Sequence, residues 1–463
     1  MHLHDTATGT VRPLELRRPG QVSMYVCGLT VYDVPHLGHG RYALVFDVLR
    51  RYLEFTGLEV RFVSNITDID DHIIARASDE GRSEPEVAAQ YEAVWWEAVD
   101  ALGVMRPSFI PHATGYVPDM VTLVADLVAR DVAYETSDGV YLSVDRVPGY
   151  GLLARQSLES LRAGARVDPG DEKRSPLDFV LWKKAKPGEP TWPSPWGPGR
   201  PGWHTECVVM SLDLLGEGFD LHGGGMDLAF PHHENERAQA VGLGRDFAHH
   251  WVHNGWVTVE GEKMSKSLGN YTSLTDLLAR ADARAYRLLV LQAHYRSPIE
   301  VTLATVEQAE KGLARLDDLA RRFALGGDLA EVRASEADAA GADAAAMASF
   351  AERMEDDLDT PGALAGIFEL VRAAHTAADA SQRDEALRLA TTAAVQCGAL
   401  GLRLRSGAEG HDDETAALLG ERDAARAGGD YGRADAIRAE LEDRGFVVED
   451  SPEGTRVHRR PSP

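Results

Sequence analysis

The chain has 463 residues, 44% of them hydrophobic and 26% charged, as in a globular protein that can bury a full core. Its net charge of -25 argues against nucleic-acid binding driven by a global positive field, but it does not exclude a local basic surface. No apolar run reaches the roughly 18 to 20 residues that cross a bilayer, and Met1–Gly20 lacks the apolar core of a signal peptide. We therefore expect a cytoplasmic protein that does not interact with membranes.

The cysteine count is low and odd, with residues at positions 27, 207 and 397. Three widely spaced cysteines do not form a disulfide framework. They fit a reducing compartment, where thiols serve as metal ligands, nucleophiles or core residues.

The N-terminal third predicts alternating strand and helix. Gln21–Cys27 has a strand pattern, Arg41–Phe55 has helical periodicity, and Leu58–Ser64 has a second strand pattern. Strand, helix and strand at this spacing predict a parallel βαβ unit.

The middle of the chain predicts helices over Pro85–Gly103 and Pro118–Arg130. A stretch rich in Pro, Gly and Trp, from about 169 to 201, indicates an irregular insertion. Alternation resumes with a strand at Phe219–His222 and a helix at His232–Val241. These patterns predict one nucleotide-binding α/β fold that is split by an insertion.

The last third predicts helices. Leu303–Leu402 has helical periodicity with almost no strand signal, which indicates a helix bundle. A polar linker over 407–413 leads to a tail with two short helices and a β-hairpin, Glu414–Arg460. The tail therefore predicts a small α+β module.

Two cysteines, a histidine and a glutamate form a candidate metal site. Cys27 ends the first predicted strand, Cys207 lies far along the chain, and His232 and Glu236 share a helix face at i, i+4. Two thiolates, an imidazole and a carboxylate suit zinc. The wide spacing leaves open that both cysteines are only core residues. His233 is a rival ligand, but its i+4 neighbour is an arginine.

The segment His36-Leu37-Gly38-His39 lies just before the first predicted helix. A helix N-terminus presents unpaired N–H groups, Gly38 permits close backbone approach, and two histidines can donate hydrogen bonds to phosphate oxygens. A purely structural turn is the alternative for so short a motif.

A second candidate phosphate-binding segment is Lys263-Met264-Ser265-Lys266-Ser267, followed by Gly269. Two lysines on a polar loop can neutralise a triphosphate as point charges. The alternative is a solvated surface loop.

The two signatures, in this order and on a split α/β fold, resemble those of the class I aminoacyl-tRNA synthetases. Further stretches resemble the cysteinyl-tRNA synthetase family, and together they cover essentially the whole chain. They are Tyr25–Asp33, Asn65–Asp71, Gly202–Cys207, His222–Gly225, Phe230–Glu236, His253–Trp256, Glu421–Arg426 and Arg433–Arg438.

The resemblance implies a class I Rossmann-like catalytic domain split by an insertion, followed by an α-helical bundle and a small C-terminal α+β module. It implies one zinc ion per chain, held by Cys27, Cys207, His232 and Glu236. His36, His39, Lys263 and Lys266 are implied as catalytic residues. Contacts to substrate or ATP are implied for Gly28, Thr30, Gly38, Thr67, Trp203, Asp227 and Lys266. Trp203 also fits core aromatic packing.

Four positions depart from the family pattern, and none removes a ligand or a signature lysine. They are Leu37, His72, Thr205 and Met226. Met226 lies in the Gly-rich turn, so the departure bears on the pocket wall. Cys397 has no role in the family and is expected to be a core residue.

The expected domain boundaries follow the same resemblance. The catalytic halves are 1–115 and 201–255, separated by a connective insertion at 116–200. The lysine loop and stem-contact region is 256–302, the tRNA-binding bundle is 303–406, and the anticodon-binding module is 407–463.

The implied reaction joins L-cysteine to the 3′ end of tRNA(Cys) through cysteinyl-adenylate. ATP with Mg²⁺ is the cosubstrate, zinc selects the substrate thiolate, and a monomer is expected. A hydrophobic pocket alone discriminates poorly between close analogues such as serine and cysteine.

Two other functions compete with this prediction. A ligase that joins cysteine to an amino-sugar in thiol cofactor synthesis has a similar catalytic core, but it does not need a bundle and a second module. A non-catalytic RNA-binding homologue would be expected to lose a signature residue, and none is lost here. We also expect a local RNA surface that includes Arg321, Arg322 and Arg438, which would explain binding despite the net charge.

Overall fold

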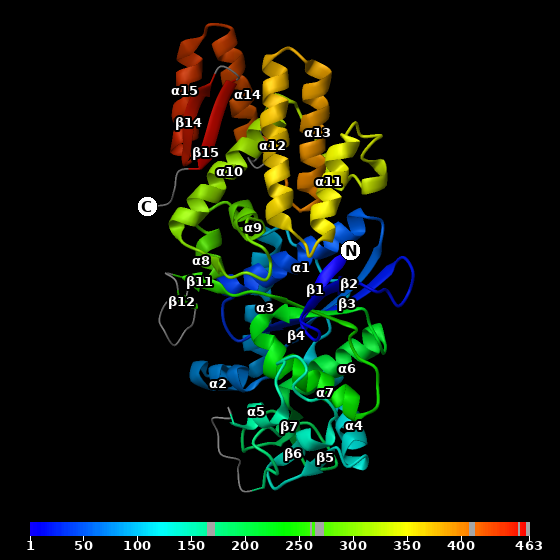
Figure 1. The fold of residues 1–463 in the computed structure, drawn as a ribbon. Helices are drawn as coiled ribbons and strands as arrows, with labels where there is room; N and C mark the ends of the chain where they lie inside the picture. The colour runs from blue at the N-terminus through cyan, green and yellow to red at the C-terminus, as the bar shows by residue number, and fades with distance from the viewer. Residues whose placement is uncertain (164–171, 260–261, 264–272, 407–412, 452–453, 460–463) are drawn as a thin grey trace.

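The computed structural model describes residues 1–163, 172–259, 262–263, 273–406, 413–451 and 454–459. The molecule is elongated, with the two helical C-terminal parts at one end, the insertion at the other, and the α/β domain between them (Figure 1). Within the described residues, no helix is both long and apolar enough to cross a membrane.

The central sheet has four parallel strands in the order β10-β9-β3-β4. These are β3 (Gln21–Thr30), β4 (Glu59–Thr67), β9 (Leu221–Gly225) and β10 (His250–Asn254). Helix α1 (Leu37–Phe55) connects β3 to β4, which confirms the predicted βαβ unit. The strand order reverses between β3 and β9, and α/β sheets bind ligands outside the carboxyl ends of strands at such a point.

Helix α1 begins four residues earlier than Arg41, so the His36–His39 segment forms its first turn rather than a preceding loop. The prediction missed this turn because Gly38 and two histidines are weak helix formers. The structure supplies the missing stabilisation: His36 is the N-cap, and its ring Nδ1 accepts from the backbone N–H of His39 at 3.3 Å.

The insertion contains a second sheet, so the expectation of an irregular segment over 169–201 is wrong in part. Four antiparallel strands lie in the order β5-β6-β7-β8: Ala133–Glu135, Gly139–Leu142, Phe179–Lys184 and Gly199–Pro201. The β7 side chains Phe179, Leu181 and Trp182 are buried, and this short apolar run was hidden between Pro- and Gly-rich turns.

Within the described part of the chain, six further α-helices precede β10. They are α2 (Asp71–Glu80), α3 (Glu84–Ala101), α4 (Val117–Ala129), α5 (Leu158–Ala163), α6 (Trp203–Leu215) and α7 (Glu234–Gly242). Strands β1 (His2–Asp5) and β2 (Thr10–Pro13) form a hairpin at the N-terminus. The predicted helices Pro85–Gly103 and Pro118–Arg130 correspond to α3 and α4.

A small sheet, β12-β11-β13, follows β10 along the chain. Its strands are β11 (Val257–Val259), β12 (Glu262–Lys263) and β13 (Ile299–Glu300). Helices α8 (Leu274–Leu278) and α9 (Ala283–Leu291) lie between β12 and β13 in sequence. This region therefore connects the α/β domain to the helical part.

The predicted bundle is confirmed as α10 (Leu303–Arg322), α11 (Ala344–Glu355), α12 (Thr360–Asp379) and α13 (Arg383–Ala399). Its core is continuous with one face of the central sheet, since one apolar cluster includes Val22, Leu49, Leu288 and Ile367. The bundle is thus packed as an extension of the α/β domain.

The tail has the predicted elements: α14 (Asp413–Ala427), α15 (Tyr431–Asp443), β14 (Phe446–Ser451) and β15 (Gly454–Arg459). It has a core of its own, formed by Leu418, Ile437, Leu441, Phe446 and Val448. Of the predicted linker at 407–413, residues 407–412 lie outside the described residues, and Asp413 is the first residue of α14.

Candidate metal centre and nucleotide site

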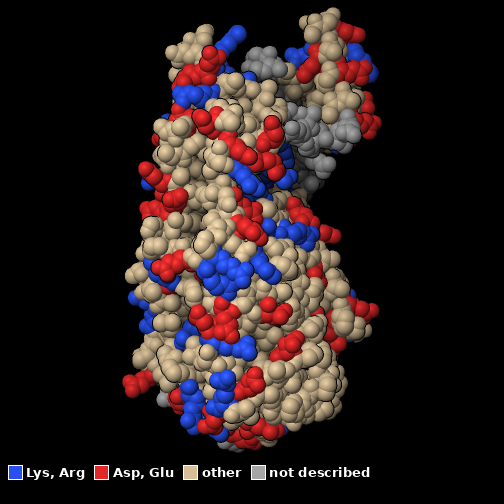
Figure 2. All heavy atoms as spheres, turned by 90° about the vertical axis from the view of Figure 1, so that its right-hand side faces the viewer, with Lys and Arg blue, Asp and Glu red and all other residues tan. Residues whose placement is uncertain are grey.

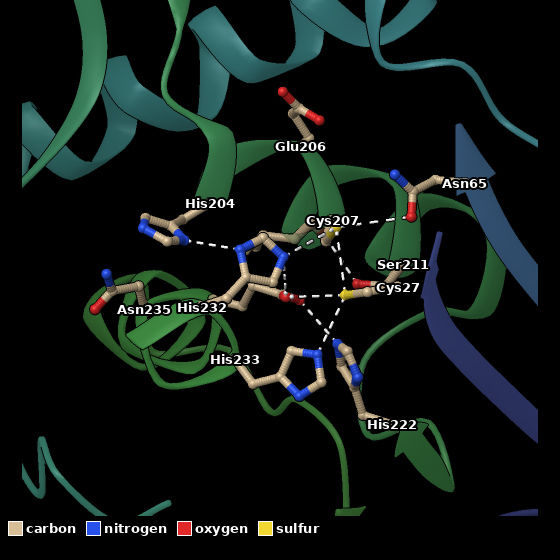
Figure 3. A network of polar contacts seen from close by, with 12 residues as sticks. Cys27, Asn65, His204, Glu206, Cys207, Ser211, His222, His232, His233 and Asn235 are labelled. Carbon is tan, nitrogen blue, oxygen red and sulfur yellow. Dashed lines mark hydrogen bonds and ion pairs between the residues drawn. The ribbon is translucent and has the colours of Figure 1, made fainter. Parts of the chain in front are cut away.

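Four side chains from four separate segments meet near the carboxyl end of β3 (Figure 3). They are Cys27 of β3, Cys207 of α6, His232 from the turn before α7, and Glu236 of α7. Their ligand atoms all lie within 4.8 Å of one another, and each residue is at most 4% exposed. The folded chain thus brings together the four residues proposed as ligands.

The spacing of these atoms suits a tetrahedral ion. The Sγ atoms of Cys27 and Cys207 lie 3.6 Å apart, and Cys207 Sγ lies 3.7 Å from His232 Nε2. Glu236 Oε1 lies 3.3 Å from Cys27 Sγ and 3.1 Å from His232 Nε2. Ligands at zinc bond lengths in a tetrahedron are separated by about 3.4 to 3.8 Å, so only small shifts would be needed.

The protonation states follow from burial. Burial, and then the neighbouring Cys207, raise the pKa of Cys27 well above its ordinary value, so its thiol is protonated when no ion is bound. Burial, and then nearby His204 and His222, lower the pKa of His232 well below its ordinary value. His232 is therefore a neutral imidazole that can donate a lone pair, whereas a bound cation would have to displace thiol protons.

The local sequence places Cys27 through its neighbour Gly28. A Cβ at Gly28 would lie 1.6 Å from the main-chain oxygen of Asn65, so only glycine fits here. The β3–β4 pairing is irregular between Val26 and Leu29, and the Gly28 N–H donates to Asn65 Oδ1 at 2.8 Å instead. This irregularity turns Cys27 toward the cluster.

A second possible donor set overlaps the first and contains Cys27, His222, His233 and Glu236. His222 Nε2 lies 2.8 Å from Glu236 Oε2, and His233 Nε2 lies 3.3 Å from Cys27 Sγ. The rival His233 thus lies beside the cluster without replacing His232. The sequence assigned His222 no role of its own, although it begins one of the stretches that resemble the family, His222–Gly225.

The predicted pocket residues surround the cluster. Thr67 ends β4, is buried, and donates its hydroxyl to Glu206 Oε2 at 2.9 Å. Asn65 Nδ2 donates to the Thr67 hydroxyl at 3.2 Å. Trp203 begins α6, is 39% exposed, and packs its ring 4.0 Å from the ring of His232. Its exposure argues against a role as a core aromatic residue.

Asn65 and Glu206 were missed as individual positions. Asn65 links Thr67 to the metal-ligand region, because its Oδ1 lies 3.8 Å from Cys207 Sγ. Burial, opposed by the hydrogen bond from Thr67, raises the pKa of Glu206 well above its ordinary value. Neither role follows from spacing along the chain, since both depend on how β4 and α6 pack.

Two other residues expected to contact substrate or ATP, Thr30 and Asp227, are not members of the four-residue cluster. Thr30 is the last residue of β3 and pairs in register with Thr67. Asp227 is exposed in the short turn Met226–Leu228, directly after β9. Both therefore lie at the carboxyl ends of adjacent strands, the side of the sheet on which the candidate metal ligands gather.

In the first turn of α1, each of the two histidine rings uses its Nδ1 as a hydrogen-bond acceptor. His39 Nδ1 accepts from the backbone N–H of His36 at 3.2 Å, and His36 Nδ1 accepts from His39 N–H. The rings stack with centroids 3.5 Å apart. Because each Nδ1 is an acceptor, the proton of each neutral ring lies on Nε2, which can donate to an anion. A Cβ at Gly38 would lie 2.8 Å from the His36 ring.

Of the two signature lysines, Lys263 lies among the described residues. Lys263 belongs to β12, where its backbone pairs with Thr258 of β11. Lys266 lies outside the described residues. The candidate metal ligands and the α1 histidines are therefore the parts of the site with defined geometry.

Three family descriptions match the chain. Residues 13–311 match tRNA synthetases class I (C) catalytic domain, residues 349–405 match the DALR domain, and residues 408–460 match the Cysteinyl-tRNA ligase anticodon binding domain.

Curated relatives match over full length. The chain is 45% identical to a Cysteine--tRNA ligase from Alkalilimnicola ehrlichii, covering 99% of this chain and 100% of that protein. It is 42% identical to a Cysteine--tRNA ligase from Syntrophobacter fumaroxidans, covering 98% and 99%.

Solved structures support the fold. A methionyl-tRNA synthetase from Mycobacterium tuberculosis aligns with a TM-score of 0.59 at 16% identity, covering 82% of this chain and 89% of that one. A LeuRS ternary complex from Agrobacterium radiobacter K84 aligns with a TM-score of 0.60 at 11% identity, covering 84% of each chain.

Proposed function

The chain belongs to the cysteinyl-tRNA synthetase family of class I tRNA synthetases, and from that membership we propose that it activates L-cysteine with ATP and transfers it to the 3′ end of tRNA(Cys). The observation that carries the proposal is the buried cluster of two thiols, an imidazole and a carboxylate at the strand-order reversal. That cluster lies where a small substrate of an α/β sheet binds.

We infer that the ion held by Cys27, Cys207, His232 and Glu236 is zinc. The mixed sulfur, nitrogen and oxygen donor set and the near-tetrahedral spacing support this identity. When bound, zinc would supply a soft Lewis acid that favours a cysteine thiolate over a serine hydroxyl. Mg²⁺ would accompany ATP.

The chain's own residues would position the reacting groups. His36 and His39 would donate from Nε2 to phosphate oxygens as charge develops on them. Lys263 and Lys266 would neutralise the triphosphate, and Thr67 would contact the bound amino acid. Attack of the cysteine carboxylate on the α-phosphate gives cysteinyl-adenylate and pyrophosphate, so the protein contributes orientation and charge rather than a nucleophile.

Gly28, Thr30, Gly38, Trp203 and Asp227 would complete the pocket for cysteine and ATP. A side chain at Gly28 or Gly38 would collide with the protein itself, so these glycines would let the backbone beside the pocket pack closely. Trp203 would cover the amino-acid side, since its partly exposed ring already packs against His232.

The remaining assignments are proposals about the whole chain. The catalytic halves would be 1–115 and 201–255, the insertion 116–200, the stem-contact region 256–302, the tRNA-binding bundle 303–406 and the anticodon-binding module 407–463. A monomer in the cytoplasm is the expected state.

The competing amino-sugar ligase is not favoured. The matches to the DALR domain and to the anticodon binding domain lie beyond the catalytic core, where such a ligase has no need of tRNA-binding parts. A non-catalytic homologue is not favoured either, because the relatives that match over full length are named as ligases.

The test is to offer the purified chain tRNA(Cys), ATP and either cysteine or serine, before and after zinc is removed with a chelator. We expect charging with cysteine only, lost on chelation and restored by zinc. Ligation of cysteine to an amino-sugar without charging of tRNA would overturn the proposal. Charging that is indifferent to zinc removal would overturn the zinc assignment alone.

A further inference from the structure

Arg41, in the second turn of α1, is a fully buried arginine outside the residues assigned above. None of the ion pairs formed among the described residues includes Arg41. Its guanidinium instead donates to three main-chain carbonyls: Trp256 at 2.6 Å, Tyr295 at 3.1 Å, and Ser297. A buried charge is costly, so an arginine that only binds carbonyls indicates a demand for its particular shape.

The three carbonyls belong to two segments that are far apart in sequence. Trp256 lies between β10 and β11, whereas Tyr295 and Ser297 lie between α9 and β13. These segments are tied to each other, since Gly255 N–H donates to Tyr295 O at 2.8 Å and Ile299 N–H donates to Trp256 O at 3.0 Å. Arg41 therefore binds both segments that lead into β11 and β13, and these two segments are also hydrogen-bonded to each other.

Two further contacts hold the same end of α1. The Tyr286 hydroxyl of α9 donates to Leu37 O at 2.6 Å. The N–H of Leu274 donates to Pro35 O at 2.8 Å, immediately before His36. The start of α1 is thus fixed against α8, α9 and the small sheet, and Arg41 in its second turn supplies a charged donor to these contacts.

We propose that Arg41 is a positioning residue that sets the α1 turn carrying His36 and His39 relative to the β11–β13 sheet, whose strand β12 carries Lys263. The proposal rests on the proposed function, because it concerns the alignment of the two groups expected to bind the triphosphate. Arg41 itself does not contact substrate; it acts through the elements that it joins.

Arginine is needed because its planar fork presents several N–H donors in fixed directions, whereas the lysine ammonium is a compact point charge. A lysine at this position cannot span three carbonyls from two segments. Burial lowers the pKa of Arg41 to about 10, so the group is still charged at neutral pH.

The test measures separate steps in the full-length Arg41→Lys variant. Misplacement by about 1 Å can slow a reaction roughly a hundredfold. We therefore expect kcat for cysteine-dependent ATP–pyrophosphate exchange to fall by about that factor, while KM for cysteine and zinc content stay within about twofold. Single-turnover transfer of cysteine from preformed adenylate to tRNA should be unchanged, because that step no longer involves the triphosphate.

The control is Arg287→Lys, at a buried arginine of α9 that donates to the main-chain carbonyls of Leu102, Gly103 and Leu400 but, unlike Arg41, also pairs with a carboxylate, that of Asp47. We expect it to lower the melting temperature without changing exchange kinetics. Tyr286→Phe, which removes only the bond to Leu37 O, should slow exchange in the same way but less. If Arg41→Lys fails to fold, this variant decides, and unchanged exchange overturns the proposal.

Equal losses in activation and transfer by Arg41→Lys would also overturn it, since they would indicate a merely structural role. Absence of exchange and charging in the wild-type chain would instead overturn the proposed function, so the two failures are distinguishable.

Discussion

Cys207 and Cys397 are both buried cysteines on helices, but their surroundings give them different roles. Cys207 lies within 4 Å of Cys27 and His232, whereas Cys397 lies in the core of the bundle. We predict that Cys207→Ser loses the bound zinc and slows cysteine-dependent ATP–pyrophosphate exchange by roughly a hundredfold or more, because an alcohol is a poor zinc ligand. Metal analysis and exchange kinetics measure the two effects.

Cys397→Ser is the control for this change. It places an extra hydroxyl in an apolar core, which should cost about 1 to 3 kcal/mol of stability if the hydroxyl finds no partner. Zinc content and exchange should be those of the wild type. Full zinc content in the Cys207→Ser variant would contradict the ligand assignment.

Much of the residue-level site could be predicted from sequence, because His232 and Glu236 share a helical spacing and the signature segments are short and contiguous. Donor chemistry made Cys27 and Cys207 candidate partners of these two residues, but 180 residues separate the two cysteines, so spacing alone left open that both are core residues. Asn65 and Arg41 could not be predicted at all. Their partners are main-chain and side-chain atoms that become neighbours only when β4, α1 and the β11–β13 sheet pack.

At the scale of elements, a buried ion pair joins α1 to α9. Asp47 and Arg287 are both buried, and their side chains lie 2.6 Å apart. Burial alone would raise the pKa of Asp47, but Arg287 and Arg51 outweigh it and lower that pKa below its ordinary value. The Arg287 guanidinium also reaches the Leu400 carbonyl at the end of α13. Asp47 therefore stabilises the junction between the catalytic sheet and the bundle.

We predict that Asp47→Asn lowers the free energy of unfolding at pH 7 by about 3 to 5 kcal/mol, because Arg287 is left buried without its charge partner. A carboxyl with a depressed folded pKa stabilises the fold above its unfolded pKa and loses that effect as the pH falls through the folded value. The difference between wild type and variant should thus be constant from about pH 5 to 8 and shrink below about pH 4.

Urea unfolding followed by tryptophan fluorescence at several pH values measures this difference. The control is Asp318→Asn, which removes the exposed partner of Arg321 and should change stability by about 1 kcal/mol or less. A pH-independent difference down to pH 3 would show that Asp47 acts by packing rather than by charge.

Helices and strands could be predicted where a periodic pattern of apolar residues extended over many positions. Helices α3, α4, α10 and α12 have clear apolar faces, whereas the strands of the insertion are short and surrounded by proline and glycine. Strand β7 pairs with β6 and β8 from distant parts of the insertion, so its stability is tertiary and its sequence carries little signal.

At the scale of the whole molecule, a net charge of -25 means that RNA binding would depend on how the basic side chains are distributed. Acidic and basic side chains are interspersed over the face in Figure 2. Arg321, Arg322 and Arg438, which we expected to bind RNA, pair with Asp318, Asp379 and Glu442. Any RNA contact by these arginines must therefore compete with a carboxylate.

The C-terminal module offers a cleaner test of RNA binding, because its core is separate from that of the bundle. A chain ending at residue 406 should keep its melting temperature and its cysteine-dependent exchange within about twofold, since neither depends on that core. Charging of tRNA(Cys) at low tRNA concentration should fall by about tenfold or more, because losing only about 1.4 kcal/mol of binding free energy weakens affinity tenfold.

The matched control for truncation is Ile437→Asp in the full-length chain. Ile437 is fully buried in the core of the module, so a carboxylate there should unfold the module while leaving the rest of the chain intact. Both variants should therefore show the same split between exchange and charging. Equal charging by the truncated and intact chains would mean that the module does not bind tRNA. Loss of exchange in both would mean that the module stabilises the catalytic domain, despite its separate core.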